Sequence, residues 1–243
     1  MTVRKEDTVT SLEAGQALPA SAAASPDVDH EWIVVGGRIR EARTSAGISV
    51  RELARRIDVS PSHVSQVERG LAAFSVRALY NVVSELGIQM DSLFDGVPEA
   101  GVETLPVEQS RRPLDEQTAL DTSGVVLRAT QRPTIKLKSG PRWERLTAQA
   151  EEGCEFLSVV YEPNPSGEPP EDFIRHSGRE YGLVVSGELN VQVGFGQATL
   201  GPGDSIAFDS SVPHRFWNAG GFETRCVWFV MNDDGSDTTL HHG

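Results

Sequence analysis

The sequence has few cysteines, a deficit of basic residues and no long apolar run. Only two of its 243 residues are cysteines, Cys154 and Cys226, and no CxxC motif contains them. We therefore expect two buried free thiols, because free Cys behaves as a small hydrophobe; the alternative is a redox pair, which the missing CxxC motif does not favour. No segment approaches the roughly 20 apolar residues of a membrane span, which predicts a cytoplasmic protein without membrane contacts.

The shortage of basic residues is uneven along the chain. In total 22 Lys and Arg stand against 35 Asp and Glu, a net charge of −13, which argues against nucleic-acid binding over the whole surface. Residues 38–70 depart from this balance, with seven Arg against four acidic residues, a local charge of +3. Because the local patch is what contacts phosphate, the total charge does not exclude a DNA-binding protein.

The spacing of apolar residues divides the chain into a helical half and a β half. We predict a disordered tail (1–29), a helical domain (32–96), a linker (97–123), a β domain (124–231) and a flexible tail (232–243). The β half contains short runs with a period of two, separated by turn residues: VVLRAT, EFLSVVYEP, YGLVVSG, LNVQVG, SIAFD, HRFWN and TRCVWFVM. The fold class is therefore α+β multidomain, with four to five helices before an all-β sandwich or barrel.

Capping signals place two short helices on either side of a tight turn at residues 58–59. Ser49 with Glu52 fits a capping box before VRELARRI, and Ser60 with Pro61 begins PSHVSQVER. Asp58 at the turn tolerates unusual backbone angles. This helix, turn and helix have the spacing of a DNA-binding helix-turn-helix.

The free face of the second of these helices carries short polar side chains that suit base edges and phosphates. The residues expected to contact DNA are Arg51, Ser60, Ser62, His63, Ser65, Gln66 and Arg69. Gln66 has the amide that pairs with adenine, and Arg51 and Arg69 lie where phosphates pass. The alternative is a protein-interaction module with a solvated Arg face.

The helical segment resembles the phage-repressor-like helix-turn-helix family of the xenobiotic-response-element type. The resemblance rests on RIREART, SVRELARRI and SPSHVSQVERG and covers about 60 residues. It implies an ion pair between Arg43 and Glu68, and a homodimer that binds a two-fold symmetric operator in double-stranded DNA.

In the β half, His176, Glu180 and His214 form a pattern that predicts a metal site. His176 and Glu180 are four residues apart, so both side chains project to one face if the segment is extended. His214 begins a strand that we expect to lie beside the segment that contains His176 and Glu180. Two imidazoles and a carboxylate make a facial triad suited to a divalent metal such as Fe, Mn, Ni or Zn.

Residues 125–231 resemble a cupin. The first motif of that family appears as Ile174, His176, Glu180 and Gly187, and the second as Pro202, Gly203, Asp204, Pro213, His214 and Asn218. The resemblance implies a double-stranded β-helix, or jelly-roll barrel, with a pocket for a small-molecule effector. Ile174 stands where four-ligand cupins have their first His, so the triad has two interpretations: a three-ligand metal site, or a pocket that uses the same groups as hydrogen-bond partners.

Together these patterns predict a DNA-binding transcriptional regulator whose cupin domain senses a small molecule, and therefore no enzyme. The alternative is a non-haem iron enzyme of the hydroxypropylphosphonate epoxidase type, which joins the same two modules and holds iron with a His, Glu, His set. That type uses a lysine just before its second helix, where this chain has Gly47.

Overall fold

The computed structural model describes residues 30–97, 119–138 and 140–232. The predicted tail 1–29, most of the predicted linker and residues 233–243 of the predicted C-terminal tail lie outside these ranges. The helices are α1 (His30–Ser45), α2 (Val50–Arg56), α3 (Pro61–Val67), α4 (Val76–Leu86), the 3-10 helix η1 (Asp91–Phe94), α5 (Ala119–Thr122) and the 3-10 helix η2 (Ala129–Gln131). No helix of the described residues is long and apolar enough to cross a membrane.

Local sequence signals explain where these helices begin and end. The hydroxyls of Ser49, Ser60 and Ser75 each accept a hydrogen bond from a backbone N–H in the first turn of α2, α3 and α4. Gly47 follows α1 and Gly87 ends α4, both with a positive φ that glycine adopts without strain. The short helices therefore have the boundaries that their capping residues predict.

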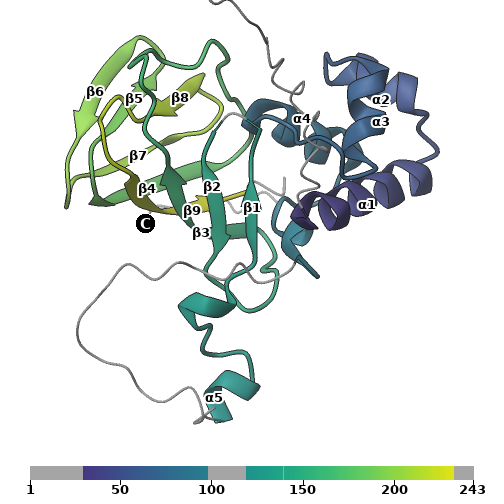
Figure 1. Cartoon of the computed structure of the whole chain (residues 1–243), viewed down its shortest axis with the longest axis horizontal. Coiled ribbons are helices and arrows are strands. Elements are labelled where there is room, and N and C mark those ends of the chain that lie inside the picture. The colour runs from purple at the N-terminus through teal and green to yellow at the C-terminus, as the bar shows by residue number, and fades with distance from the viewer. Residues whose placement is uncertain (1–29, 98–118, 139, 233–243) are drawn as a thin grey trace, which may run out of the picture.

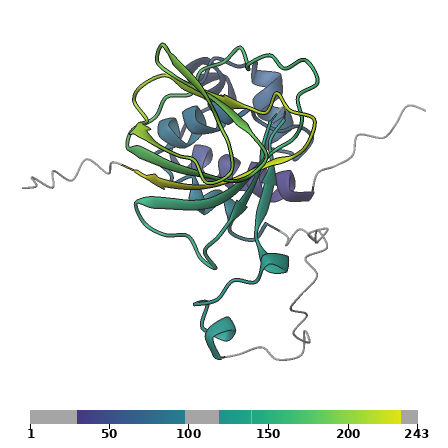
Figure 2. The same ribbon diagram turned by 90° about the vertical axis from the view of Figure 1, so that its left-hand side faces the viewer.

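The described part of the β half contains nine strands. They are β1 (Thr134–Lys136), β2 (Arg142–Arg145), β3 (Cys154–Tyr161), β4 (Arg179–Ser186), β5 (Leu189–Val193), β6 (Gly196–Leu200), β7 (Ser205–Asp209), β8 (His214–Trp217) and β9 (Thr224–Met231). One sheet has the order β1-β2-β3-β9-β4-β7 and the other the order β6-β5-β8, and every strand pair is antiparallel. Figure 2 looks onto this barrel, with the helices behind it. The predicted α+β architecture is confirmed.

Some strand predictions are wrong. The run VVLRAT, at residues 125–130, forms no strand: Val125 is exposed, and η2 occupies the end of the run. This segment pairs with no strand of the described residues. Its Arg128 forms an ion pair with Asp121. Three strands, β1, β2 and β6, have no counterpart in the prediction because they are short and polar.

The helices and the barrel share one buried apolar cluster, so the two halves form a continuous unit. Trp32 of α1 donates its indole N–H to the carbonyl of Lys136 in β1 at 2.7 Å. The guanidinium of Arg145 in β2 donates to the Asp95 carboxylate at 2.9 Å, and lies against η1. Figure 1 shows the helices α1–α4 gathered beside the barrel, next to β1 and β2. The cysteines are free thiols, with Cys226 buried and Cys154 half-buried.

Candidate functional site

The helix-turn-helix predicted from the sequence is present as α2 and α3. Asp58 between them has a φ of 58°, the one positive φ of a non-glycine residue in the described part of the chain. Ala54, Val64 and Val67 are buried where α2 and α3 pack together. Only half of the expected capping box forms. Ser49 accepts a hydrogen bond from the Glu52 N–H, but the Glu52 carboxylate binds arginines of its own helix.

The structure leaves most of the expected DNA-contacting side chains accessible. Exposed residues are Arg51, Ser60, Ser62, Gln66 and Arg69, and Ser65 and His63 are half-buried. The ring of His63 packs edge-on against Phe74, at 5.3 Å between centroids. Burial, and after it the charge of Lys138, lowers the pKa of His63. Among the residues expected to contact DNA, His63 is therefore the one whose ring also packs against the protein.

Arg43 and Glu68 lie side by side at the C-terminal end of α3, which we call the recognition helix because it carries the expected base contacts. Arg43 Nη2 donates to Glu68 Oε2 at 2.9 Å, a second bond joins Arg43 Nε to Oε1, and both side chains are buried. The hydrogen bond to Glu68 raises the pKa of Arg43. Arg43 Nη1 also donates to the carbonyl of Ile48, so the pair links α1, the start of α2 and the end of α3.

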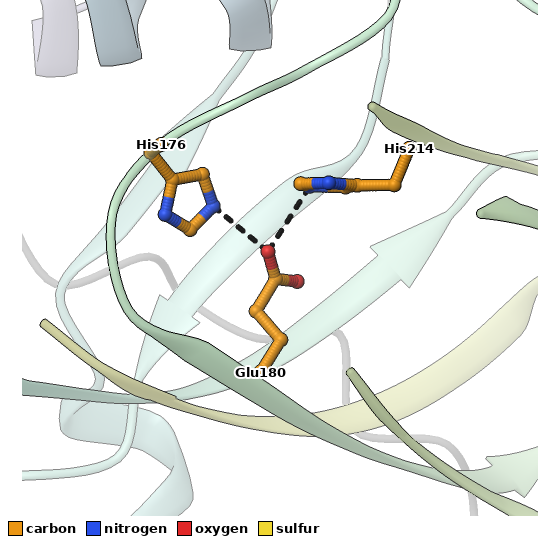
Figure 3. Close-up of side chains that lie close together, drawn as sticks. All are labelled: His176, Glu180 and His214. Atoms are coloured by element: carbon orange, nitrogen blue, oxygen red, sulfur yellow. Dashed lines mark hydrogen bonds and ion pairs between the residues drawn. The ribbon is translucent and has the colours of Figure 1, made fainter. Parts of the chain in front are cut away.

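The predicted metal ligands converge at one end of the barrel (Figure 3). His176 Nε2 lies 2.8 Å and His214 Nε2 3.0 Å from the same oxygen, Glu180 Oε1. Glu180 and His214 are buried and His176 nearly so. One ligand atom from each residue lies within 4.8 Å of the others. The structure thus brings together all three residues of the proposed triad.

The route by which these residues meet differs from the expectation. His176 precedes β4 in a loop that turns at Gly178, with a φ of 100°, so residues 176–180 are not one extended segment. The backbone N–H of His176 donates to Ser210 O, which anchors that loop. Strand β8, which His214 begins, pairs with β5 and lies in the three-stranded sheet. The imidazole of His214 therefore reaches Glu180 across the barrel and not from a neighbouring strand.

Backbone carbonyls fix the tautomers of both imidazoles. His176 Nδ1 lies 3.0 Å from Ser177 O and His214 Nδ1 lies 2.9 Å from Val212 O. A carbonyl oxygen only accepts, so a neutral ring that donates from Nδ1 presents a lone pair at Nε2, which is the form that a metal ligand needs. His214 Nε2 is accordingly a buried atom without a hydrogen-bond partner, although it lies 3.0 Å from Glu180 Oε1. Three lone pairs converge on one point, which is an arrangement that a cation stabilises.

The residues present therefore fit a divalent metal. Burial alone would raise the pKa of Glu180, but the two imidazoles beside it outweigh burial and lower that pKa to about 2. The carboxylate is thus ionised, as a metal ligand must be. The carbonyls that hold each Nδ1–H are the outer partners typical of ligating histidines. Ile174, at the motif position where four-ligand cupins have their first His, is bridged to His214 through the backbone and lines the cavity beside the triad.

A cavity of about 720 Å³ opens next to the triad. Glu180 and His214 line it, together with aromatic side chains of the barrel: Trp143, Tyr161, Phe216, Trp217 and Trp228. Helix α4 and its N-cap Ser75 form another wall, to which the helix contributes Val76, Arg77 and Tyr80. The cavity is therefore bounded by both halves of the chain.

Tyr80 is the residue that sequence reasoning missed. Its ring stacks on the His176 imidazole, with 4.1 Å between centroids and 3° between planes, and meets Trp143 edge-on at 6.0 Å. Arg77, one turn earlier in α4, binds Asp172 of the barrel at 2.8 Å. Nothing local in the sequence SVRALYNVV distinguishes Tyr80 from a core aromatic, since its contact with His176 joins residues 96 positions apart.

Comparison with known proteins agrees with both halves of the fold. Residues 39–93 match the helix-turn-helix family HTH_3, and residues 157–230 match the cupin domain family Cupin_2. The chain therefore joins a helix-turn-helix domain to a cupin domain. The regulator PuuR of Escherichia coli (strain K12) is 21% identical over 188 residues, 77% of this chain and 89% of PuuR. An uncharacterized transcriptional regulator of Rhodospirillum rubrum is 37% identical over 67 residues, 28% of this chain and 62% of that protein.

Solved structures share the architecture. An HTH_3 family transcriptional regulator from Vibrio cholerae has a TM-score of 0.55 and 16% identity, over 84% of this chain and 98% of that chain, which shows the fold alone. The hydroxypropylphosphonic acid epoxidase from S. wedmorenis has a TM-score of 0.39 and 20% identity, over 85% of this chain and all of that chain. At that TM-score, the likeness carries no argument about the chemistry of this chain.

Proposed function

We propose that this protein is a transcriptional regulator that binds a two-fold symmetric operator in double-stranded DNA as a homodimer in the cytoplasm. A small-molecule effector that binds in the cupin cavity changes its affinity for the operator. The exposed residues of α3, above all Gln66, read base edges, while Arg51 and Arg69 bind phosphates on either side. The proposed domain limits are those given by the sequence: 32–96 for DNA binding and 124–231 for sensing.

The observation that carries this proposal is the shared cavity. Tyr80 belongs to α4 of the DNA-binding half, yet it lines the cavity and stacks on His176 of the barrel. A ligand that enters the cavity meets both halves at once. Such a ligand shifts operator affinity if it binds one arrangement of α4 better than another, a coupling that is typically worth about 1–3 kcal/mol.

A divalent metal held by His176, Glu180 and His214 is part of this proposal. Fe, Mn, Ni and Zn all accept such a set of nitrogen and oxygen donors. When bound, the metal supplies a positive charge and open coordination positions for an oxygen or nitrogen atom of the effector. The role of the chain is to hold the two Nε2 atoms and the Glu180 carboxylate in place, and to surround them with aromatic walls.

The test is operator binding by full-length protein, measured as fluorescence anisotropy with the DNA upstream of its own gene and with a scrambled duplex as control. We expect specific binding, and a change in affinity when Fe(II) or Zn(II) is added to chelator-treated protein. The double variant His176→Ala/Glu180→Ala should keep the metal-free affinity and lose the metal response. A double variant that responds as the wild type does would move the sensing site elsewhere.

A second candidate function rests on the same triad, because three protein ligands leave positions open for substrate and O₂ in non-haem iron enzymes. Purified Fe(II)-loaded protein distinguishes the two. Stoichiometric iron and O₂ consumption with a hydroxyalkylphosphonate, without any specific DNA binding, would establish the enzyme. Specific DNA binding without O₂ consumption is what we expect.

A further inference from the structure

The barrel places one lysine beside the DNA-binding helices. Lys138 lies two residues after β1, and its backbone N–H donates to the carbonyl of Phe74 at 3.3 Å. Phe74 is the last residue of the loop between α3 and α4, because the next residue, Ser75, is the N-cap of α4. Figure 1 shows this end of β1 next to the start of α4. A cation of the β half therefore lies at the loop that follows the recognition helix.

Phe74 also packs against the first turn of the recognition helix. Its ring meets the His63 imidazole edge-on, with 5.3 Å between centroids, and meets the ring of Trp32 in α1 at 6.4 Å. Both Phe74 and Trp32 are fully buried, which fixes the backbone to which Lys138 is bound. Burial lowers the pKa of His63 and the charge of Lys138 lowers it further, so the ammonium group and the imidazole lie close enough to interact. Lys138 is thus held near the end of α3 that is expected to enter the major groove.

The side chain of Lys138 is free to contact a partner. It is exposed, and it forms no ion pair with a carboxylate in the part of the chain that the structure describes. Arg77 in α4, by contrast, is bound to Asp172 of the barrel at 2.8 Å. Between Arg69 and Arg77 the sequence GLAAFSV contains no basic residue. The loop after α3 therefore brings no cation of its own to the phosphates that flank a recognition helix in the major groove.

We propose that Lys138 binds a phosphate of the operator, so that the barrel contributes directly to the DNA-binding surface. This contact rests on the proposed function, because it adds a residue to the operator complex. An ammonium group binds phosphate as a point charge on a flexible stem, which suits a side chain that starts from a fixed backbone position. The net charge of −13 repels DNA over most of the surface, so a cation beside the recognition helix has a large effect on affinity. A phosphate contact carries no sequence information and weakens as the salt concentration rises.

The experiment measures the dissociation constant of the full-length protein by fluorescence anisotropy from about 50 to about 200 mM KCl, with the DNA upstream of its own gene and with a scrambled duplex. Lys138→Met should weaken binding to both duplexes by similar factors. It should also reduce the slope of log affinity against log salt by about 0.9, the value of one phosphate contact. The advantage of the wild type should therefore shrink about 3.5-fold over this range of salt. Lys138→Arg should keep the wild-type slope, because it keeps the cation.

The matched control is Lys136→Met, which removes the same charge from the same segment of the chain. Lys136 is also exposed, but its backbone is bound by Glu31 and Trp32 at the start of α1 and not by the loop after α3. Its slope should remain close to that of the wild type. Circular dichroism melting shows whether the variants are folded, and Lys138→Gln is a second neutral variant if Lys138→Met fails to fold.

Two results would overturn the phosphate contact while the proposed function stands. One is specific binding by the wild type with an unchanged slope in the neutral Lys138 variants. The other is an equal decrease of the slope in Lys136→Met, because the effect would then come from net charge alone. A wild type that binds neither duplex would overturn the proposed function, and the contact with it, so the two failures are distinguishable.

Discussion

Two adjacent glycines in α1 offer a test of how the recognition helix is positioned. A Cβ added at Gly36 would lie 2.0 Å from the carbonyl oxygen of Val67, the last residue of α3. The nearest atoms are backbone, so the clash is relieved only if α1 and α3 move apart. A Cβ at Gly37 would have nothing within 4 Å, which makes Gly37→Ala the matched control for Gly36→Ala.

Alanine at these two positions should change the free energy of unfolding in opposite directions. Gly37→Ala replaces an exposed glycine inside a helix and should raise the free energy of unfolding by about 0.5–1 kcal/mol. Gly36→Ala gains the same helix propensity, but overpacking a buried contact typically destabilises by about 1–3 kcal/mol. Its clash is with rigid backbone, so we expect the upper part of that range. Because α3 shifts with Val67, Gly36→Ala should also weaken operator binding.

Urea unfolding followed by circular dichroism measures the change in stability, and fluorescence anisotropy with operator DNA measures the change in operator affinity. We expect Gly36→Ala to be less stable than Gly37→Ala by about 2–3 kcal/mol, the cost of the clash alone, because both variants gain the same helix propensity. Equal stabilities of the two variants would refute the close approach of α1 to α3. A destabilised Gly36→Ala with unchanged operator affinity would refute the link between that contact and the placement of α3.

Three further substitutions test the DNA-reading helix, the buried ion pair and a buried acid. Gln66→Ala should weaken operator binding and relax one base preference by about 1–3 kcal/mol, whereas equal loss on every sequence would assign Gln66 to phosphate. Arg43→Met leaves Glu68 buried and unpaired, so urea unfolding should show a loss of about 3–5 kcal/mol, with part of it recovered by adding Glu68→Leu. Burial raises the pKa of Glu155 from 4.5 to about 7, so the folded state favours the neutral acid. That stabilisation is complete below pH 4.5 and is lost as the pH rises through about 7. Glu155→Gln should therefore unfold with a free energy higher than wild type by about 3 kcal/mol near pH 8, and show little difference near pH 4.5. An unchanged difference between the two pH values would contradict the buried acid.

Much of the helical half could be predicted because its signals are local. Serine caps, glycine ends and the turn at Asp58 lie within a few residues of the helices that they define. The convergence of His176, Glu180 and His214 was also predictable, because the spacing of the motifs indicates which side chains meet. The expected path of the chain between them was wrong. The barrel was expected to place β8 beside β4, but it lies in the other sheet. Sheet order depends on pairings between distant segments, which local periodicity does not encode.

What the sequence does not reveal is how the two halves meet. The strands β1 and β2, which receive the helices, are too short and polar to give a period-two pattern. The stack of Tyr80 on His176 joins α4 to a loop of the barrel, and neither residue has a neighbour in the sequence that signals the contact. This contact is nevertheless what places a residue of the DNA-binding half directly on a proposed metal ligand.

The most direct test of the proposed coupling compares operator affinity in four samples: wild type and Tyr80→Leu, each with and without Zn(II) after chelator treatment. Leu keeps an apolar group in α4 but removes the ring that stacks on His176. We expect Zn(II) to change the dissociation constant of the wild type by about 5- to 150-fold and that of Tyr80→Leu by much less. An equal change in both proteins, or none in the wild type, would contradict the claim that the cavity acts on the DNA-binding helices through Tyr80.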